Sequence, residues 1–545
     1  METIITPGCA ILAGLLSDYG ITRAVLSPGS RNAPLIEALT DGRFETTVII
    51  DERCAAFAAL GMSTAGRPAV LVCTSGTALL DYAPAVAEAF YRRVPLIVVS
   101  ADRPEEWVDQ RDSQTIRQPG ALTAIVRRSV DIREDMTDAT VNRLLNDAIA
   151  DAFGPIAGPV HINMHLSLRR EDPRPVEWRR FLTFRADAIA PENMKYLFAD
   201  LALSGRIMLV VGSTPGLRIP AALMENPSVA VVAELNANLE GPDEIFTPNL
   251  YEPVLRKLSQ EECNRPEYII SIGGALISDG FKKFLRASGA KTIGVGFDDC
   301  FVDTFLNLYA QVQADPQVFL DAWAAHTQDV RTDYRDFWAD TGRRLKARIA
   351  GEEFHRWSDL GALLEVEKYV PAGTTLFLGN GMSVRYGQLV PWRGLRAVYA
   401  NRGVSGIDGC TSTAAGVSMV TPGPVLLLTG DMGFAYDIGA LALPEVGSTL
   451  KIVVLDNGGG DIFRRVRTTR DLPHRDECFV ARPYLPLSYV STSYGFSYFY
   501  AAGFHEAAGS IGDFFAEDVN PAILHIRTTE EDNTSAYNRL HSIKP

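Results

Sequence analysis

A regular alternation of short apolar runs with helical patterns is the feature that most constrains how these 545 residues can fold. Apolar runs near the N-terminus span residues 21–26, 46–50, 69–73 and 96–100, and amphipathic helical patterns between them span 53–66 and 78–92. Strands separated by helices of this length predict βαβ units, whose strands pair in parallel. The same rhythm returns in the stretches 207–295 and 375–526. The sequence therefore predicts an α/β protein with doubly wound, mostly parallel sheets.

Two polar segments divide the chain into three blocks of similar size. Residues 169–180 are rich in Arg, Pro, Asp and Glu, and residues 326–357 form a charged helical pattern ahead of the third block. A chain of this length is expected to form about three domains. We predict domains at 1–180, 181–350 and 351–545, each built around its own sheet.

The charge balance narrows the classes of ligand. With 52 basic and 66 acidic residues, the net charge is −14, which opposes affinity for nucleic acid but permits a local cationic pocket. The seven cysteines are scattered without a CxxC pair, which is typical of reduced thiols inside the cell. No apolar run approaches the roughly 20 residues that a membrane-spanning helix requires. We expect a cytoplasmic protein that binds neither nucleic acid nor a membrane.

Two consecutive apolar runs in the third block end in residues that suit a divalent metal. In PVLLLTGDMGF the apolar run is followed by Gly430 and Asp431. In KIVVLDNGGGDIF it is followed by Asp456, Asn457 and three glycines. Asp431 and Asn457 are 26 positions apart, enough for one helix and a return strand, so both would lie at the carboxyl edge of neighbouring strands. Magnesium prefers oxygen ligands and is often completed by substrate phosphates. Each turn alone could be an ordinary helix cap, but the pair predicts a metal site.

This pattern resembles the diphosphate-binding motif of thiamine-diphosphate (ThDP) enzymes. The resemblance implies that Asp431, Asn457 and the backbone carbonyl of Gly459 hold Mg²⁺, or alternatively Mn²⁺, on the cofactor diphosphate. Met432 stands where a glycine is common and Asp456 where a first asparagine is common, but neither is an expected ligand. The implied architecture is that of pyruvate oxidase and pyruvate decarboxylase, with an N-terminal pyrimidine-binding domain, a central domain and a C-terminal diphosphate-binding domain.

The same family implies a catalytic glutamate after the second strand of the N-terminal domain. TTVIIDERCAAFAALG places Glu52 there. Its carboxyl group would hydrogen-bond to N1′ of the aminopyrimidine and favour the imino tautomer, whose nitrogen removes the C2 proton of the thiazolium. A glutamate in the first turn of a helix is also favoured by the helix dipole alone. The catalytic interpretation of Glu52 therefore depends on the distal metal motif.

Five further motifs occur in an order similar to that of the 2-succinyl-5-enolpyruvyl-6-hydroxy-3-cyclohexene-1-carboxylate (SEPHCHC) synthases of menaquinone biosynthesis. They are LSPGSRNAPL, TSGTA, SADRPEE, SQTIRQPG and NRGVSGIDG, and PGPVHIN at 157–163 closes the first block. The middle block matches only in its strand rhythm. The resemblance implies a ThDP- and Mg²⁺-dependent transferase. It would decarboxylate 2-oxoglutarate, releasing CO₂, and join the resulting four-carbon unit to isochorismate by 1,4-addition.

Both implied substrates carry two carboxylates, so the pocket should be cationic although the chain is acidic. Arginine suits a planar carboxylate because its guanidinium group donates two parallel hydrogen bonds. Four arginines follow predicted strands and match the synthase pattern: Arg31, Arg103, Arg385 and Arg402. A single such arginine is more simply explained by a surface ion pair, whereas four at strand ends predict substrate binding.

The remaining site residues are assigned by the resemblance alone. Those expected near the second substrate or the cofactor are Ser30, Ser113 and Gln114. Lys282 is the middle-domain lysine expected to reach the substrate, although Lys283 is an alternative in the same register. Ile407 matches the bulky residue that bends ThDP, while Ile462 and Phe463 match apolar residues near the reacting carbons; core packing is the alternative for all three. Gly381 stands where we expect a serine, which removes one hydroxyl donor.

The resemblance also implies an assembly. In ThDP enzymes each site combines the glutamate-bearing domain of one chain with the metal-bearing domain of another, so we expect at least a homodimer, and a dimer of dimers stays open. Two alternative functions also stay open. A ThDP 2-oxoacid decarboxylase or acetolactate-synthase-like enzyme would use another acceptor, which the arginine set disfavours. A non-catalytic metabolite- or dinucleotide-binding protein is disfavoured by the joint presence of Glu52, Asp431 and Asn457.

Overall fold

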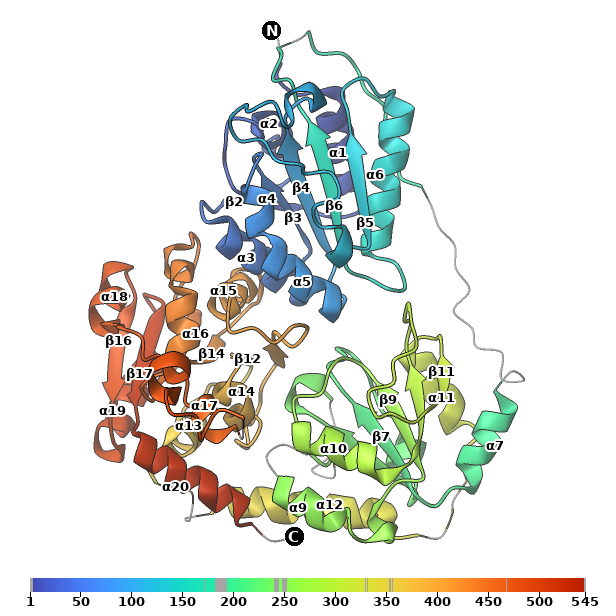
Figure 1. Cartoon of the computed structure of the whole chain (residues 1–545), viewed down its shortest axis with the longest axis vertical. Coiled ribbons are helices and arrows are strands. Elements are labelled where there is room, and N and C mark those ends of the chain that lie inside the picture. Colours follow the sequence, from blue (N-terminus) through green and yellow to red (C-terminus); the bar gives the residue numbers. More distant parts are fainter. Residues whose placement is uncertain are drawn as a thin grey trace.

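Three sheets follow one another along the chain, and each forms a separate lobe with its helices (Figure 1). The computed structural model describes residues 3–170, 172–181, 194–239, 245–247, 252–328, 330, 332–351, 354, 356–466 and 468–543. All strand pairs in these residues are parallel. The predicted α/β class with doubly wound parallel sheets is confirmed.

The N-terminal sheet has the strand order β2-β1-β3-β4-β6-β5. Its strands are β1 (Arg23–Leu26), β2 (Glu45–Val48), β3 (Ala69–Cys73), β4 (Leu96–Asp102), β5 (Arg128–Ile132) and β6 (Pro159–His165). Its helices are α1 (Pro7–Asp18), α2 (Ala33–Leu39), α3 (Glu52–Thr64), α4 (Ala78–Asp81), α5 (Ala83–Arg92) and α6 (Asp138–Ala152). Strands β3, β4 and β6 are buried along their whole length, because helices cover both faces of a doubly wound sheet.

One predicted helix of this lobe is wrong in its extent. The pattern at 78–92 forms two helices, α4 and α5, which meet at Tyr82. Pro84 follows this junction and has no N–H with which to continue the backbone hydrogen bonds of α4. The amphipathic pattern therefore continues through residues 78–92, although the backbone hydrogen bonds of the helix are interrupted.

The central sheet has the strand order β11-β10-β9-β7-β8. Its strands are β7 (Ile207–Val211), β8 (Val229–Ala233), β9 (Tyr268–Ile272), β10 (Lys291–Val295) and β11 (Leu308–Val312). Its helices are α7 (Lys195–Leu203), α8 (Ala221–Met224), α9 (Glu252–Leu258), α10 (Asp279–Ser288), α11 (Pro316–Ala324) and α12 (Tyr334–Ile349). Helix α12 packs on β8 and leads into the third lobe, with which the central lobe shares a continuous apolar core.

The C-terminal sheet has the strand order β13-β12-β14-β15-β17-β16, which repeats the order of the N-terminal sheet strand for strand. Its strands are β12 (Thr375–Leu378), β13 (Ala397–Ala400), β14 (Val425–Gly430), β15 (Leu450–Asp456), β16 (Ser497–Ala501) and β17 (Ala522–Arg527). Its helices are α13 (Asp359–Glu367), α14 (Met382–Gly387), α15 (Cys410–Val420), α16 (Asp431–Tyr436), α17 (Ile462–Arg465), α18 (Leu487–Ser493), α19 (Phe504–Ala516) and α20 (Glu530–His541). Helix α3 after β2 therefore corresponds to α15 after β13.

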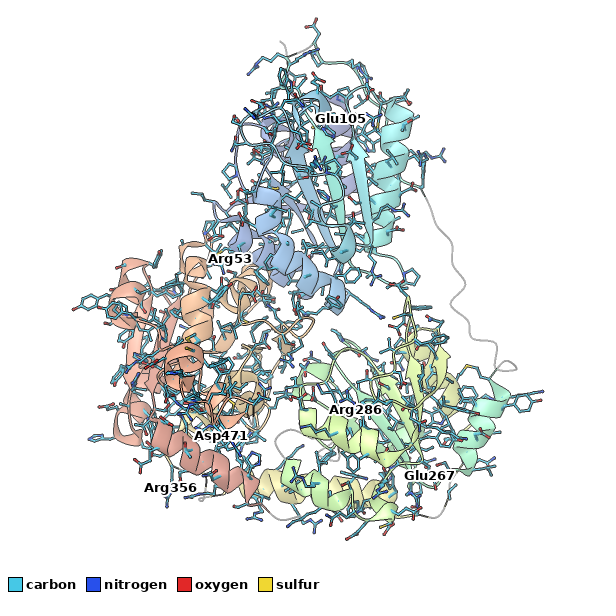
Figure 2. All side chains as sticks on the ribbon, in the orientation of Figure 1. Arg53, Glu105, Glu267, Arg286, Arg356 and Asp471 are labelled. Atoms are coloured by element: carbon cyan, nitrogen blue, oxygen red, sulfur yellow. The ribbon has the colours of Figure 1, made fainter. Side chains whose placement is uncertain are left out.

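These two corresponding helices join the N-terminal and C-terminal lobes (Figure 1). They approach until their backbones touch, since a Cβ atom on Gly61 would lie 2.1 Å from the carbonyl oxygen of Thr413, and one on Gly416 would lie 2.0 Å from that of Ala58. At one end of α3, Arg53 donates to the carbonyl oxygen of Tyr436 at 3.3 Å, at the junction labelled in Figure 2. Small residues thus allow a close contact between the lobes.

The segments between the sheets contain the predicted domain boundaries. The boundaries after residues 180 and 350 fall between consecutive sheets and stay predictions, and residues 182–193 lie outside the described part of the chain. Among the helices that the structure describes, none combines the length and apolarity needed to cross a membrane.

Candidate active site

The structure places Asp431 and Asn457 at the same edge of the C-terminal sheet. Strands β14 and β15 pair up to Gly430 and Leu455, so both residues leave the sheet side by side. Oδ2 of Asp431 accepts hydrogen bonds from the N–H groups of Gly458 at 3.1 Å and Gly459 at 2.7 Å. The carboxylate of Asp431 therefore lies directly against residues 458–460, which we call the glycine loop.

Asn457 presents an unsatisfied oxygen at this edge. Its Nδ2 donates to Oδ2 of Asp359 at 2.8 Å, whereas its Oδ1 is buried without a hydrogen-bond partner among the described residues. Leaving such a group unpaired costs about 1–3 kcal/mol. A carboxylate, an amide oxygen and a backbone carbonyl are the oxygen ligands that Mg²⁺ prefers. The residues present therefore fit a divalent cation.

Gly459 makes the close approach of this loop possible. Its φ is +117°, and a Cβ atom there would lie 2.4 Å from the carbonyl oxygen of Val480. Only glycine satisfies both conditions without displacing the neighbouring backbone. The glycine loop can consequently expose its own backbone groups to a ligand.

The electrostatics of this edge also favour a bound cation. Burial, together with the nearby Asp456 carboxylate, raises the pKa of Asp431 above its usual range. Burial also tends to raise the pKa of Asp456, but hydrogen bonds from His525 and Arg527 hold the pKa of this carboxyl group well below its usual range. Those hydrogen bonds are 3.0 and 2.5 Å long and come from β17. They give Asp456, which replaces the common asparagine, partners within the protein.

A cavity of about 360 Å³ opens beside the two carboxylates, lined by Asp431, Asp456 and residues 482–486. The glycine loop leads from it into α17, where the Phe463 ring packs over Gly460 and lies 5.7 Å from the ring of Phe479. Ile462 and Phe463 are both half-buried at the start of this helix. The structure thus brings Ile462 and Phe463 next to the glycine loop.

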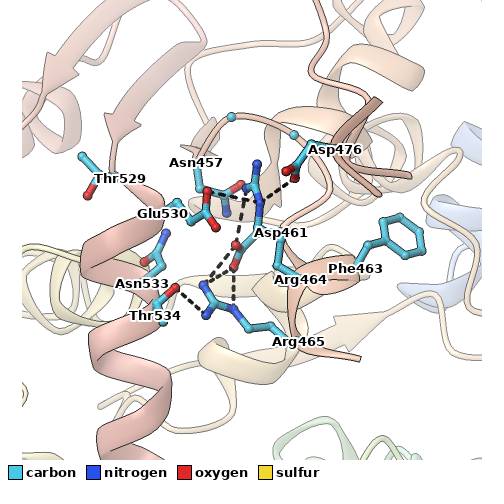
Figure 3. Close-up of polar contacts among 12 residues, drawn as sticks. Asn457, Asp461, Phe463, Arg464, Arg465, Asp476, Thr529, Glu530, Asn533 and Thr534 are labelled. Atoms are coloured by element: carbon cyan, nitrogen blue, oxygen red, sulfur yellow. Dashed lines mark hydrogen bonds and ion pairs between the residues drawn. The ribbon is translucent and has the colours of Figure 1, made fainter. Parts of the chain in front are cut away.

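Helix α17 is fixed by a network of ion pairs (Figure 3). Arg465 donates to both oxygens of the buried Asp461 at 3.0 and 3.1 Å and to Thr534 of α20 at 2.8 Å. Arg464 pairs with Asp476 at 3.2 Å and with Glu530 at 3.4 Å. The C-terminal helix α20 therefore supports the segment that carries Ile462 and Phe463.

Glu52 occupies the first position of α3, directly after the N-cap Asp51. Its side chain is half-buried, and burial, together with the nearby carboxylates of Asp81 and Asp51, raises the pKa of Glu52. A raised pKa suits a carboxyl group that must hold a proton near neutral pH. Close to it in sequence, Val48 and Ile50 are 51% and 82% exposed, which leaves large apolar side chains at the surface.

The two N-terminal arginines lie together. The pKa of Arg31 is lowered by burial and by the neighbouring charge of Arg103. Arg31 donates to the carbonyl oxygen of Leu166 at 2.6 Å, and Arg103 donates to that of Ser113 at 2.8 Å. The predicted Ser30 and Gln114 are exposed in the same two loops. We call Arg31 and Arg103 the N-terminal arginine pair.

A second cationic group forms where the central and C-terminal lobes meet. Burial and the charge of Arg385 lower the pKa of Arg402. Burial opposes ionisation of Asp279, but Lys282 and Arg385 lower its pKa nonetheless, and Lys282 pairs with Asp279 at 2.8 Å. Lys283, the alternative in the sequence, is exposed. We call Lys282, Arg385 and Arg402 the C-terminal cationic cluster.

Both arginines of this cluster hold the loop after β12. Arg385 donates to the carbonyl oxygen of Gly381 at 2.7 Å, and Arg402 donates to Oδ1 of Asn380 at 2.9 Å. Gly381 has φ +93°, a backbone conformation that glycine adopts more readily than the expected serine. Three of the four predicted arginines also retain a buried Nε without a partner in the described residues: Arg31, Arg103 and Arg402. Such unsatisfied donors suit anionic ligands.

The predicted site residues are distributed over the three lobes. Glu52 and the N-terminal arginine pair belong to the N-terminal lobe, Asp431 and Asn457 belong to the C-terminal lobe, and the C-terminal cationic cluster combines Lys282 of the central lobe with Arg385 and Arg402 of the C-terminal lobe. Each lobe therefore presents one part of the predicted site.

The chain is similar to known proteins over almost its whole length. Residues 7–121 match the family model described as "Thiamine pyrophosphate enzyme, N-terminal TPP binding domain". The SEPHCHC synthase of Porphyromonas gingivalis is 36% identical, with 96% of this chain and 95% of the relative covered. Those of Cytophaga hutchinsonii and Desulfotalea psychrophila are 33% and 35% identical, covering 96% and 88% of this chain and 97% and 90% of the relatives. The chain belongs to the SEPHCHC synthase family.

Membership of the SEPHCHC synthase family confirms the predicted relation to ThDP enzymes. The matched N-terminal segment includes Glu52 and the N-terminal arginine pair. The predicted metal ligands Asp431, Asn457 and Gly459 and the C-terminal cationic cluster lie outside that segment. The roles of all these residues stay predictions. The cofactor class is thus supported by the family, whereas the individual ligands rest on geometry.

The sequence did not single out Glu88, which links two lobes of this synthase family member. Glu88 lies on α5, is 2% exposed, and accepts hydrogen bonds from the N–H groups of Gly403 at 2.8 Å and Val404 at 2.7 Å. It thereby holds the loop after β13 that carries Arg402 and the half-buried Ile407. A lone glutamate within the apolar pattern APAVAEAF was the available signal.

Proposed function

We propose that the chain is a cytoplasmic, homodimeric SEPHCHC synthase that converts 2-oxoglutarate and isochorismate into SEPHCHC and CO₂, using ThDP and Mg²⁺. Its seven cysteines are all free, which supports the proposed location. The reaction belongs to menaquinone biosynthesis, the pathway implied by the family. Mn²⁺ is the alternative metal because it accepts the same oxygen ligands.

The strongest support comes from the edge of the C-terminal sheet at which Asp431 and Asn457 lie, which we call the metal edge. Asp431 and Asn457 leave adjacent strands, and the buried Oδ1 of Asn457 lacks a partner in the described residues. We assign the metal to Asp431, Asn457 and the carbonyl group of Gly459, with Gly430 at the diphosphate. ThDP, when bound, supplies the electron sink for loss of CO₂ from a 2-oxoacid.

The residues of the chain have separate tasks around that cofactor. Glu52 holds a proton at its carboxyl group for the cofactor ring nitrogen, a task that its raised pKa supports. Ile407 would support ThDP from the C-terminal lobe when it is bound, and Ile462 and Phe463 would exclude water from the reacting carbons. Ser30 contributes a hydroxyl group on the glutamate-bearing side.

The cationic groups account for the choice of substrates. The N-terminal arginine pair and the C-terminal cationic cluster together offer five cations to the four carboxylates of the two substrates. Ser113 and Gln114 add polar contacts beside the arginine pair. Because guanidinium groups bind carboxylates in a fixed orientation, they position the acceptor ring against the donor carbon. An acetolactate-synthase-like enzyme with a small neutral acceptor would not need this charge.

A homodimer would complete the site. One chain presents Glu52 on its N-terminal lobe and the metal edge on its C-terminal lobe. The exposed Val48 and Ile50 next to Glu52, at 51% and 82%, and Tyr436 near α3, at 57%, support burial against a second copy.

The central lobe is poorly suited to the alternative function of binding a dinucleotide. Nucleotide phosphates usually bind a helix N-terminus at the switch point of such a sheet. Here the buried Glu234 accepts hydrogen bonds from the N–H groups of Ile277 and Ser278, at 2.7 and 2.9 Å, just ahead of α10. A Cβ atom on Gly212 would lie 2.0 Å from the carbonyl oxygen of Gly274, so the loops after β7 and β9 already touch.

The decisive experiment follows isochorismate with the purified protein, ThDP, Mg²⁺ and 2-oxoglutarate. Isochorismate should disappear, and SEPHCHC should form, only when every component is present. Persistence of isochorismate in the complete mixture with folded protein would overturn the proposal. Release of CO₂ from 2-oxoglutarate at the same rate without isochorismate would instead favour a simple decarboxylase, and a bound yellow flavin would favour the acetolactate-synthase-like alternative.

A further inference from the structure

Asp359 makes the only hydrogen bond that the described residues give to the side-chain amide of Asn457. It occupies the first position of α13, 98 residues before Asn457 in the sequence, and its side chain is fully buried. Its Oδ2 accepts from Nδ2 of Asn457 at 2.8 Å. The opposite atom of the same amide, Oδ1, is the buried oxygen without a partner.

We propose that Asp359 is a positioning residue that fixes the amide of Asn457 with its oxygen, rather than its nitrogen, facing the metal. This inference rests on the metal site of the proposed function. Asp359 itself does not touch the metal, and it acts only through the orientation of Asn457.

The argument follows from the chemistry of the two side chains. The carboxyl oxygens of Asp359 accept from side chains of Asn457, Thr528 and Asn533, whereas an amide has one donating and one accepting atom. The rotated amide would place Oδ1 of Asn457 against Oδ2 of Asp359 and would leave both oxygens unpaired. The rotated amide would also turn its NH₂ group towards the cation, and an amide NH₂ group has no free lone pair with which to bind a metal. Asp359 therefore excludes the unproductive orientation.

The carboxylate of Asp359 is itself held in place. Its Oδ1 accepts from Oγ1 of Thr528 at 2.6 Å and from Nδ2 of Asn533 at 3.2 Å. Its backbone N–H donates to Oδ1 of Asn533 at 2.8 Å. Asn533 lies on α20, close to the loop of Asn457 (Figure 3). A carboxylate with both oxygens engaged cannot turn away from Asn457.

The substitution Asp359→Asn tests this role with almost no change in shape. An amide at residue 359 can pair with either orientation of Asn457, so it no longer selects one. Calorimetric titration of Mg²⁺ into the full-length protein with saturating ThDP should show affinity weakened about 10–100-fold, the usual effect of losing a partner of a metal ligand. Saturating Mg²⁺ should restore the binding of ThDP. Asp359→Ala, which removes both oxygens, is the second variant and should show a loss of similar size.

Thr528→Val is the matched control, because it removes one hydrogen bond to Asp359 but leaves the contact with Asn457. Its Mg²⁺ affinity should stay within about twofold of the wild-type value, since the partner of the metal ligand is retained. A double-mutant cycle then separates positioning from general damage. In an Asn457→Ala background, Asp359→Asn should cause no further loss, because the group on which it acts is absent.

Two results would overturn the inference. One is an unchanged Mg²⁺ affinity in both Asp359 variants, and the other is an equal loss in the presence and absence of the Asn457 side chain. If the wild-type chain itself fails to bind Mg²⁺ with ThDP, the proposed function fails as well. The failure of the inference alone is therefore distinguishable.

Discussion

Replacing Gly61 with alanine tests the closest contact between the N-terminal and C-terminal lobes. Gly61 lies within α3, and an added Cβ atom would lie 2.1 Å from the carbonyl oxygen of Thr413 and 2.9 Å from the backbone nitrogen of Val417 on α15. The first distance falls short of real Cβ contacts by about 1 Å, and closely packed interiors cannot absorb such a displacement freely. Because the obstructing atoms are backbone, the two helices must move apart.

The expected cost combines two opposing effects. Overpacking of this kind costs about 1–3 kcal/mol, occasionally more. Alanine is a better helix former than glycine by about 1 kcal/mol, which offsets part of that cost. Because the added Cβ atom would lie only 2.1 Å from backbone, the packing cost falls at the upper end of this range, and we expect a net loss of about 2 kcal/mol in the free energy of unfolding.

Gly509 provides the matched control, because it also lies within a helix, α19, but has nothing within 4 Å of an added Cβ atom. Gly509→Ala should stabilise the protein by about 1 kcal/mol through helix propensity alone. Urea unfolding followed by circular dichroism should move the midpoint down for Gly61→Ala and up for Gly509→Ala. Equal or parallel shifts in the two variants would refute the packing argument.

Three further changes test the site and its surroundings. Glu52→Gln should retain the binding of ThDP and Mg²⁺ in calorimetry but lose turnover by at least about 100-fold, because an amide cannot exchange the proton; near-normal turnover would remove Glu52 from the mechanism. Asp431→Ala should abolish stabilisation of the protein by ThDP with Mg²⁺ in a thermal-shift titration, and an unchanged shift would place the metal elsewhere. Burial opposes the charge of His165, but the carboxylate of Asp131 and the carbonyl group of Arg103 raise the pKa of His165 to about 9. Because this value exceeds the unfolded value of about 6.5, the stabilisation is complete below pH 6.5 and is lost as the pH rises towards 9. Its upper bound is on the order of 3 kcal/mol. His165→Asn should remove this decline in denaturant midpoints measured from pH 6.5 to 9, and a wild-type-like decline would contradict the assignment.

The sequence predicted best those strands that are buried on both faces. Strand β3 has the predicted bounds, 69–73, because a strand covered by helices on both sides appears as an unbroken apolar run. The strands β5, β11 and β16 were not predicted. Each lies at the edge of its sheet and has at most two buried residues, so its apolar signal is weak.

The metal edge could be predicted because its residues adjoin their strands. Asp431 and Asn457 directly follow β14 and β15, and parallel strands bring their carboxyl ends together whatever the intervening chain does. Asp359 and Glu88 gave no comparable signal. They act across 98 and 315 positions in sequence, on Asn457 and Gly403 respectively, so only folding creates their contacts.

By itself, the sequence determined the α/β class, the ThDP-enzyme relationship and the residues at the strand ends, because these depend on local periodicity and on motifs a few residues long. The tertiary structure decided which of these residues meet. It brought Arg31 next to Arg103 and Arg402 next to Arg385, paired Lys282 rather than Lys283 with Asp279, and placed Asp359 behind Asn457. Such choices depend on the packing of helices from distant parts of the chain, and no local pattern encodes the distance between them.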